Sequence, residues 1–396
     1  MPPTATRVIR GLLLAALLLP FPLGAVQELA EVTQQIEAPR TPGAAGPEGL
    51  PLAELLEAAG VPGVSVAVVR DFQLHWSRAF GVADVETGVP VQEETLFQAA
   101  SISKPVTAMA ALRLVREGRI ALDGDVNGML RSWQVPLRPE HDVTPVTPRS
   151  LFSHTSGADD GFGFPGYDPA APRPDLHGIL NGEAPSNVGP VHFARPPYQA
   201  YKYSGGGTTI MQLALTELTD RPFAALMEAT VLSPLGMTRS SFQQPLSSEW
   251  TTHAARAHDG AGRARSAPWH VYPEQAAAGL WTTATDLARF IAEVQQAALG
   301  PEGAVLDRAM ALEMITPVGV GPYGVGLALE KRGEGWYFSH SGSNRGFRGL
   351  ILGHVRKGYG VAILTNADNG REVIDELLAR VAAAYGWDML DGPLRR

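Results

Sequence analysis

What the chain lacks narrows its chemistry. Its 396 residues include no cysteine, which excludes disulfide bonds, thiolate metal sites, a cysteine nucleophile and a lipidated N-terminal cysteine. No His-x-x-x-His, His-Glu-x-x-His or Gly-x-Ser-x-Gly sequence occurs, which argues against a zinc hydrolase and against the nucleophile elbow of α/β-hydrolases. The formal net charge of −8 provides no basic footprint for nucleic acid. We therefore expect no metal, no cofactor and no nucleic-acid partner.

Long apolar runs are also scarce, and the one near the N-terminus is short. Arg7 and Arg10 precede the apolar run 11–19, and the small residues Gly24 and Ala25 follow it. This order is typical of a cleaved secretory signal peptide, with an uncleaved membrane anchor as the alternative. We expect an exported protein, periplasmic or extracellular, whose mature form does not contact the membrane. We expect the chain to consist of a signal peptide at 1–25, a short helix and linker at 26–51, and the folded domain at 52–390.

Strand patterns occur at both ends of the chain, and helical patterns lie between them. Apolar or alternating runs bounded by turn residues predict strands at 64–69, 74–80, 325–330, 335–340, 349–354 and 360–366. Apolar spacing and capping residues predict helices at 105–115, 148–154, 208–219, 223–231, 371–385 and from 283 onwards. Residues 159–197 are rich in Gly, Pro and Asp and predict long loops around a cleft. The expected fold class is α+β, an antiparallel sheet made from N- and C-terminal segments, flanked by helices, with an inserted and mainly helical lobe.

Ser101 and Lys104 form the most informative motif. At no other place does one of the four lysines have a serine three residues before it, and that spacing puts both side chains on one helix face. A serine hydroxyl is a weak nucleophile until a base takes its proton, and a desolvated lysine can be that base. Pro105 suits a first helical turn, so Ser101 would lie near backbone N–H groups that favour negative charge. The alternative is an N-cap serine beside a surface lysine.

Two further motifs could line the same site. Tyr203 is followed by Ser204 and the three glycines 205–207, where a phenol could relay a proton beside a flexible turn. The alternative there is a packed tyrosine. Residues 339–344, Ser-His-Ser-Gly-Ser-Asn, end a predicted strand, and Gly342 could let a substrate lie against the strand edge. The alternative there is an ordinary transition from strand to turn.

In order and spacing, these three motifs resemble the serine β-lactamase and penicillin-binding-protein superfamily. The branch they look most like contains class C β-lactamases, D-alanyl-D-alanine carboxypeptidases and related esterases and D-aminopeptidases. The family pattern is Ser-x-x-Lys, then Tyr-x-Asn, then Lys/His-x-Gly. Family-like phrases at 151–157 and 278–288 support the resemblance, which covers about residues 50–385.

The resemblance implies a role for each matching residue. Ser101 would be the acylated nucleophile, Lys104 its base or a charge that tunes its neighbours, and Tyr203 the relay to the leaving group. His340 would line the pocket as a fourth catalytic position. The backbone N–H groups of Ser101 and Ser343 would form the oxyanion hole. The remaining expected substrate-binding residues are Gly205, Ser341, Gly342 and Arg345.

Two positions depart from the family pattern. Gly205 stands where the family usually has Asn, whose side chain would bond a substrate acylamide, so efficient β-lactam hydrolysis is put in doubt. His340 stands where β-lactamases have Lys, which removes a permanent positive charge. We hypothesise that Arg345 or Arg348 supplies the charge for a substrate carboxylate instead.

The function expected from these motifs is that of an exported serine hydrolase with a covalent acyl-enzyme. Its substrates would be small molecules or peptides: esters, D-amino-acid peptides or β-lactams. A carboxylesterase on the same fold is one alternative, favoured if the pocket around His340 is apolar. A non-catalytic penicillin- or peptide-binding relative is the other. The sequence leaves the choice of substrate and the oligomeric state open.

Overall fold

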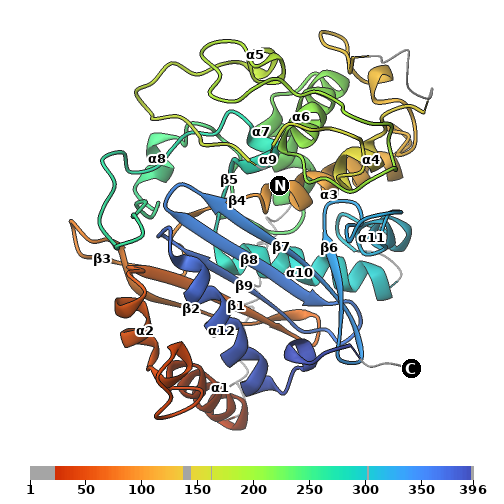
Figure 1. Ribbon diagram of the computed structural model, residues 1–396. Coiled ribbons are helices and arrows are strands. Elements are labelled where there is room, and N and C mark those ends of the chain that lie inside the picture. The colour runs from red at the N-terminus through yellow and green to blue at the C-terminus, as the bar shows by residue number, and fades with distance from the viewer. Residues whose placement is uncertain (1–22, 137–143, 162, 301–302, 394–396) are drawn as a thin grey trace, which may run out of the picture.

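The protein is built around one antiparallel sheet that joins the two ends of the chain (Figure 1). The computed structural model describes residues 23–136, 144–161, 163–300 and 303–393. The sheet has seven strands in the order β3-β2-β1-β9-β8-β7-β6. The strands are β1 (Gly63–Arg70), β2 (Gln73–Asp84), β3 (Val89–Pro90), β6 (Ala328–Arg332), β7 (Gly335–Asn344), β8 (Phe347–His354) and β9 (Gly360–Thr365).

The pairing of β1 with β9 joins the N-terminal strands of the sheet to the C-terminal strands. The register runs from Val64 opposite Thr365 to Val69 opposite Gly360, so segments about 300 residues apart share one ladder. Both strands are apolar because helices cover both faces of the sheet. Since neither face is exposed to solvent, the two strands do not alternate between apolar and polar residues. The predicted α+β class, with its sheet formed from both chain ends, is confirmed.

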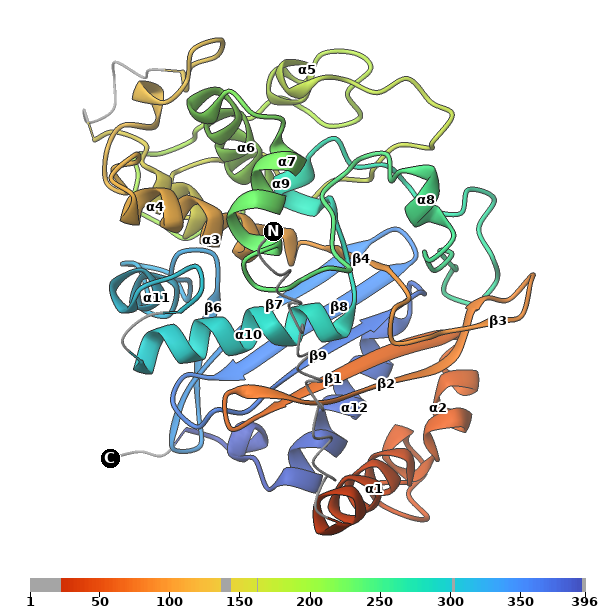
Figure 2. The same ribbon diagram turned by 180° about the vertical axis from the view of Figure 1, so that it is seen from behind.

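Successive residues of β1 supply two separate cores. Val64, Val66 and Val68 face the layer that contains α1 (Leu23–Glu37), α2 (Leu52–Ala58) and α12 (Gly370–Tyr385). Ala67 and Val69 face the opposite layer, where α10 (Ala284–Leu299) crosses the sheet (Figure 2). This is the period of two that a strand imposes on its side chains.

The inserted lobe lies at one end of the sheet and is mainly helical, as predicted (Figure 1). Between α4 and α6 the expected long loops are present, interrupted by the short α5, whose first turn is capped by Asp175. The lobe and its border contain α3 (Ser103–Arg116), α4 (Pro148–Phe152), α5 (Leu176–Asn181), α6 (Gly205–Thr219), α7 (Phe223–Met227), a π-helical turn (Glu228–Leu232), α8 (Ser248–Thr251), α9 (Gln275–Ala278) and α11 (Arg308–Met314). A second, two-stranded sheet pairs β4 (Phe97–Ala100) with β5 (Leu280–Thr282).

The segment 38–51, expected to be a linker, is held against the main domain. Arg380 of α12 is only 2% exposed, and its guanidinium donates to the carbonyls of Ile36, Pro47 and Leu50. A buried arginine from the far end of the chain therefore fixes the position of this linker. Composition alone could not reveal that long-range partner.

The predicted signal peptide lies outside the described residues except for its last three, which belong to α1. In the described part of the chain, every helix is too short or too polar to cross a membrane. One strand begins later than expected: β6 starts at Ala328, because Gly326 adopts a left-handed φ of +91° and packs against α3.

Candidate active site

The turn between β4 and α3 presents Ser101. Ala100 ends β4 with φ +52°, a conformation that L-residues rarely adopt and that is tolerated where surrounding contacts enforce it. The hydroxyl of Ser103 enforces it here, donating to the Ala100 carbonyl at 2.6 Å and accepting from the Leu280 N–H at 2.9 Å. Ser101 therefore lies two residues before α3, held between strand and helix.

Lys104 is buried directly behind this hydroxyl. Its Nζ donates to Ser101 Oγ at 3.1 Å and to the Ala277 carbonyl at 2.8 Å, while the side chain is only 2% exposed. Burial lowers the pKa of Lys104 to about 7, and the negative charge of Asp160 opposes part of that shift. A substantial fraction of the amine is neutral near pH 7 and can accept a proton.

Tyr203 completes a cluster around the same hydroxyl. Its phenol hydrogen-bonds to Ser101, and its ring centre lies 5.1 Å from Lys104 Nζ. Burial raises the pKa of Tyr203, so the phenol keeps its proton at neutral pH. The structure thus brings together three side chains that the sequence places as far apart as residues 101 and 203.

His154 and Asp160 contact Tyr203 and the residues that follow it, and so hold Tyr203 in position. The His154 ring packs against the Tyr203 ring with centroids 4.2 Å apart, and its Nδ1 accepts from the Ser204 N–H at 3.2 Å. Asp160 accepts from the Ser204 hydroxyl and, at 2.6 Å, from the Gly206 N–H, which anchors the start of α6. The sequence motifs did not indicate either residue, because these contacts span 44 to 50 residues.

His340 lines the other wall from β7. It is 3% exposed, its ring centroid lies 6.2 Å from that of Tyr203, and its Nδ1 bonds the Ser341 carbonyl at 2.8 Å. Burial, reinforced by the nearby Lys104 charge, lowers the pKa of His340 to about 3. The imidazole is therefore neutral throughout the physiological range, and this wall carries no positive charge.

Aromatic rings enclose this region. Tyr323 meets His340 edge-on with centroids 5.9 Å apart, and it stacks on Tyr201 at 5.6 Å. The same Tyr323 ring meets His154 edge-on at 4.8 Å. The surroundings of His340 are thus largely aromatic, with the phenol rings of Tyr203 and Tyr323 on either contact.

The edge of β7 beside the nucleophile is open. Pairing with β6 ends at Ser339, whereas pairing with β8 continues to Asn344 opposite Phe347. The turn at Arg345–Gly346 has two residues, so Asn344 and Phe347 form a hydrogen-bonded pair. Such pairs alternate with non-hydrogen-bonded pairs along an antiparallel ladder, and the N–H of Ser343 therefore points away from β8. The third motif is therefore the last part of a strand rather than a turn, and its free edge faces outward.

Gly342 has a packing reason to be glycine. A Cβ there would lie 2.1 Å from the Ala99 carbonyl oxygen, so only glycine lets β4 approach β7 this closely. The amide of Asn344 ties the same strands together, donating to Gln98 Oε1 at 3.0 Å and to the Ala278 carbonyl at 3.1 Å. The neighbouring Ser341 is exposed on the opposite face.

Gly205 also has a defined neighbour. A Cβ at this position would lie 2.7 Å from Cε2 of Phe164, so the phenyl ring occupies the space that a larger side chain would need. Lys202 forms an ion pair with Asp159. The start of α6 therefore presents an aromatic ring instead of an amide.

The two arginines after β7 differ. Arg348 donates to the carbonyls of Asn344 and Phe347, and its guanidinium lies 3.3 Å from Asp368. Arg345 is exposed, and its guanidinium forms no ion pair or side-chain hydrogen bond with the described residues. Of the two candidates, Arg345 is the one available to a ligand.

A Ser–Lys–Tyr cluster with a buried lysine, beside a strand edge, is the arrangement that the sequence motifs implied. A family model described as "Beta-lactamase" matches residues 52–385. The chain therefore belongs to the beta-lactamase family.

Individual relatives are more distant. Esterase EstB of Burkholderia gladioli is 33% identical over 209 residues, which are 50% of this chain and 50% of that protein. The first curated relatives are matched over 50% to 63% of their own length.

Among solved structures, a beta-lactamase/D-alanine carboxypeptidase from Pseudomonas syringae has 19% identity and a TM-score of 0.67, covering 90% of this chain and 99% of that one. A D-amino acid amidase from Ochrobactrum anthropi SV3 has the same identity, score and coverages. At this identity the two structures confirm the fold alone.

Proposed function

We propose that this protein is a serine hydrolase that cleaves esters through an acyl-enzyme on Ser101. The observation that carries the proposal is the 3.1 Å contact between Ser101 Oγ and the buried Lys104 amine, whose pKa burial lowers to about 7. A base with a pKa near the working pH balances availability against proton-transfer driving force. A surface lysine beside a capping serine, the alternative considered from sequence, would not be buried.

In acylation, Ser101 Oγ attacks the substrate carbonyl carbon while its proton passes to the neutral Lys104 amine. The carbonyl electron pair moves to oxygen, and the N–H groups of Ser101 and Ser343 stabilise that oxyanion. When the intermediate collapses, the bond to the leaving group breaks. The Lys104 ammonium then returns the proton to the leaving oxygen or nitrogen through the Tyr203 hydroxyl.

Deacylation reverses these roles. A water molecule attacks the acyl carbon and gives its proton, through Tyr203, to the neutral Lys104 amine. Ser101 Oγ leaves as the second tetrahedral intermediate collapses and recovers a proton from Lys104. Tyr203 acts as a relay in both steps because its raised pKa disfavours a standing phenolate.

Two features favour esters over β-lactams. Phe164 occupies the space beside Gly205, so no side-chain amide is present there to bond an acylamide group. His340 is neutral and surrounded by aromatic rings, so the wall offers no fixed cation for the carboxylate of a β-lactam. Amides of D-amino acids are the second candidate, supported by the open β7 edge, which can pair with a peptide backbone.

We also propose that the protein is exported. Its support is the order of basic, apolar and small residues before position 26. The test is the N-terminal sequence of the protein recovered from a periplasmic or culture fraction, which should begin near residue 26.

The first experiment is intact mass spectrometry after incubation with a fluorophosphonate and, separately, with a fluorescent penicillin. Wild type should gain the fluorophosphonate mass, and Ser101→Ala should not. A penicillin adduct on wild type would move the proposal towards β-lactams and D-amino-acid peptides. Folded wild type with no adduct from either reagent would contradict the covalent mechanism and favour a non-catalytic binding protein.

A further inference from the structure

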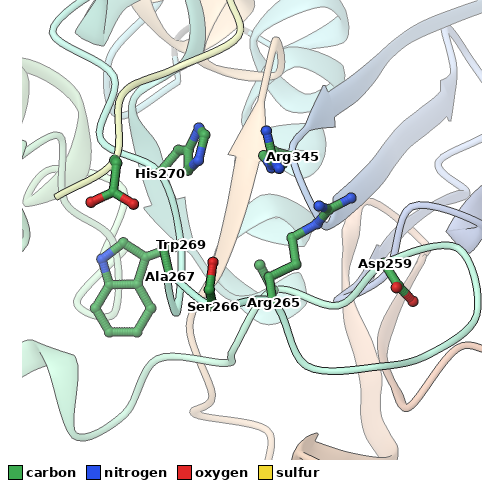
Figure 3. Close-up of a pocket in the computed structure, with 9 residues that line it drawn as sticks. Asp259, Arg265, Ser266, Ala267, Trp269, His270 and Arg345 are labelled. Atoms are coloured by element: carbon green, nitrogen blue, oxygen red, sulfur yellow. The ribbon is translucent and has the colours of Figure 1, made fainter. Parts of the chain in front are cut away.

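A cavity of about 390 Å³ opens beyond the end of β7, where Arg345 begins the turn into β8 (Figure 3). In this view His270 and Arg345 lie on either side of a strand, and the tip of Arg265 lies beside Arg345. Trp269 forms an apolar wall, packed edge-on against Trp281 with centroids 5.3 Å apart. The volume is within the range of pockets that bind small organic groups.

The pocket is lined by two carboxylates, Asp168 and Asp259, and by two guanidinium groups, Arg265 and Arg345. Asp259 is satisfied by Arg263 and by the N–H groups of Ala261 and Arg263. Asp168 accepts the N–H of Ala170 at 2.9 Å. Arg345 has no carboxylate partner among the described residues.

Arg265 is the second arginine that lines the pocket. It pairs with Asp368, but that carboxylate is shared with Arg348, so one anion faces two guanidinium groups. Arg265 is thus held by a carboxylate, whereas the Arg345 guanidinium has no such partner among the described residues and can pair with an anionic ligand.

Hydrogen bonds connect the pocket to β4, the strand that precedes Ser101. The Gln98 carboxamide donates to the His270 carbonyl at 2.7 Å and accepts from Asn344 at 3.0 Å, three residues before Ser101. The Arg345 N–H donates to the Tyr272 hydroxyl at 3.1 Å. Since a strand rises ~3.4 Å per residue, the Arg345 backbone lies about 7 Å beyond the N–H of Ser343.

We propose that this pocket, named here the Arg345 pocket, binds a carboxylate at the far end of the substrate's acyl group. The acyl chain would follow the open edge of β7 past Ser343 and place its terminal carboxylate at Arg345, with its apolar stem against Trp269. The preferred substrates are then esters of dicarboxylic acids, or acyl groups with an acidic end. This inference rests on the proposed hydrolase function for its catalytic readout.

The test compares two p-nitrophenyl esters, the octanoate and the monoester of octanedioate, which differ in the terminal carboxylate. In Arg345→Gln the ratio of kcat/KM for the octanedioate ester to that for the octanoate ester should fall about tenfold, as for loss of a charge-assisted hydrogen bond. Arg345→Lys should recover part of the ratio. Arg371→Gln, an exposed arginine on α12, is the control of equal charge and should leave the ratio unchanged.

A binding measurement separates this inference from the proposed function. Calorimetric titration of Ser101→Ala with octanedioate should show binding that weakens about tenfold when Arg345→Gln is added. A ratio unchanged within twofold in Arg345→Gln, or equal octanedioate affinity in both proteins, would overturn the pocket assignment even if Ser101 is acylated. Binding that depends on Arg345 in a wild-type protein that hydrolyses neither ester would overturn the hydrolase proposal and leave the pocket standing.

Discussion

At the scale of single residues, the proposed mechanism depends on the burial of Lys104 beside Ser101. The spacing of Ser101 and Lys104 predicted that they share a helix face, and that geometry is observed. The burial of Lys104 and its second bond to Ala277 could not be predicted, because α9 lies 173 residues further along the chain. The same holds for His154 and Asp160, whose positioning contacts come from distant segments.

The lowered pKa of Lys104 predicts the pH dependence of activity. Because the neutral amine is the base, kcat/KM for an uncharged ester should rise with pH through about 7 and then level off. Lys104→Arg should lower kcat/KM by about 10²- to 10⁴-fold, since arginine stays protonated. His340, whose pKa is about 3, should not contribute. An acidic limb that disappears in His340→Gln would contradict this assignment.

Gly205 and Phe164 should be energetically coupled. Gly205→Asn places a Cβ 2.7 Å from the Phe164 ring, which must move, at a cost of about 1–3 kcal/mol in the free energy of unfolding. Phe164→Ala should relieve that cost, so the double variant should be more stable than the sum of the single changes predicts. Urea unfolding of all four proteins measures the coupling, and strictly additive effects would exclude it.

At the scale of elements, β4 approaches β7 closely beside the proposed oxyanion hole. The strand patterns predicted β7, but they ended it near His340, whereas it continues to Asn344. Small polar residues look like a turn in isolation; here pairing with β8 keeps them extended. The contact of Gly342 with Ala99 joins segments more than 240 residues apart, so no local sequence pattern could predict it.

A side chain at position 342 should disturb catalysis more than one at position 341. In Gly342→Ala the new Cβ would lie 2.1 Å from the Ala99 oxygen, forcing β4 and the Ser101 turn away from β7. We expect a loss of about 1–3 kcal/mol in unfolding free energy and at least about tenfold in kcat. Ser341→Ala, on the exposed face, is the matched control for stability. Equal stability of the two variants would show that β4 can shift freely.

At the scale of the whole molecule, the sequence predicted the sheet from both chain ends and the helical insertion, because long apolar patterns mark them. The ordering of 38–51 by Arg380 was missed, since only the tertiary fold supplies the partner. Glu274 was missed for the same reason: it is fully buried at the start of α9, and both its carboxyl oxygens are without a hydrogen-bond partner among the described residues.

Glu274 should make the folded protein less stable as pH rises. Burial raises the pKa of Glu274 from its ordinary value of about 4.5 to about 7, so between these pH values the native state binds a proton that the unfolded state has lost. Stability is then fully present below about 4.5 and falls as the pH rises to 7, by about 2–3 kcal/mol. Glu274→Gln, permanently neutral, should be more stable than wild type at pH 8 and similar at pH 4.5. Melting curves at both pH values measure this, and an equal difference at both would contradict the assignment.

The pairing of β1 with β9 also has a consequence for timing. The ribosome completes Ser101, Lys104 and Tyr203 long before it reaches β7, β8 and β9. Until those last strands dock, β1 lacks its central neighbour and Ser343 cannot face the nucleophile. The proposed nucleophile is therefore synthesised well before the strand that completes its site, and we expect activity only after the C-terminal strands have docked.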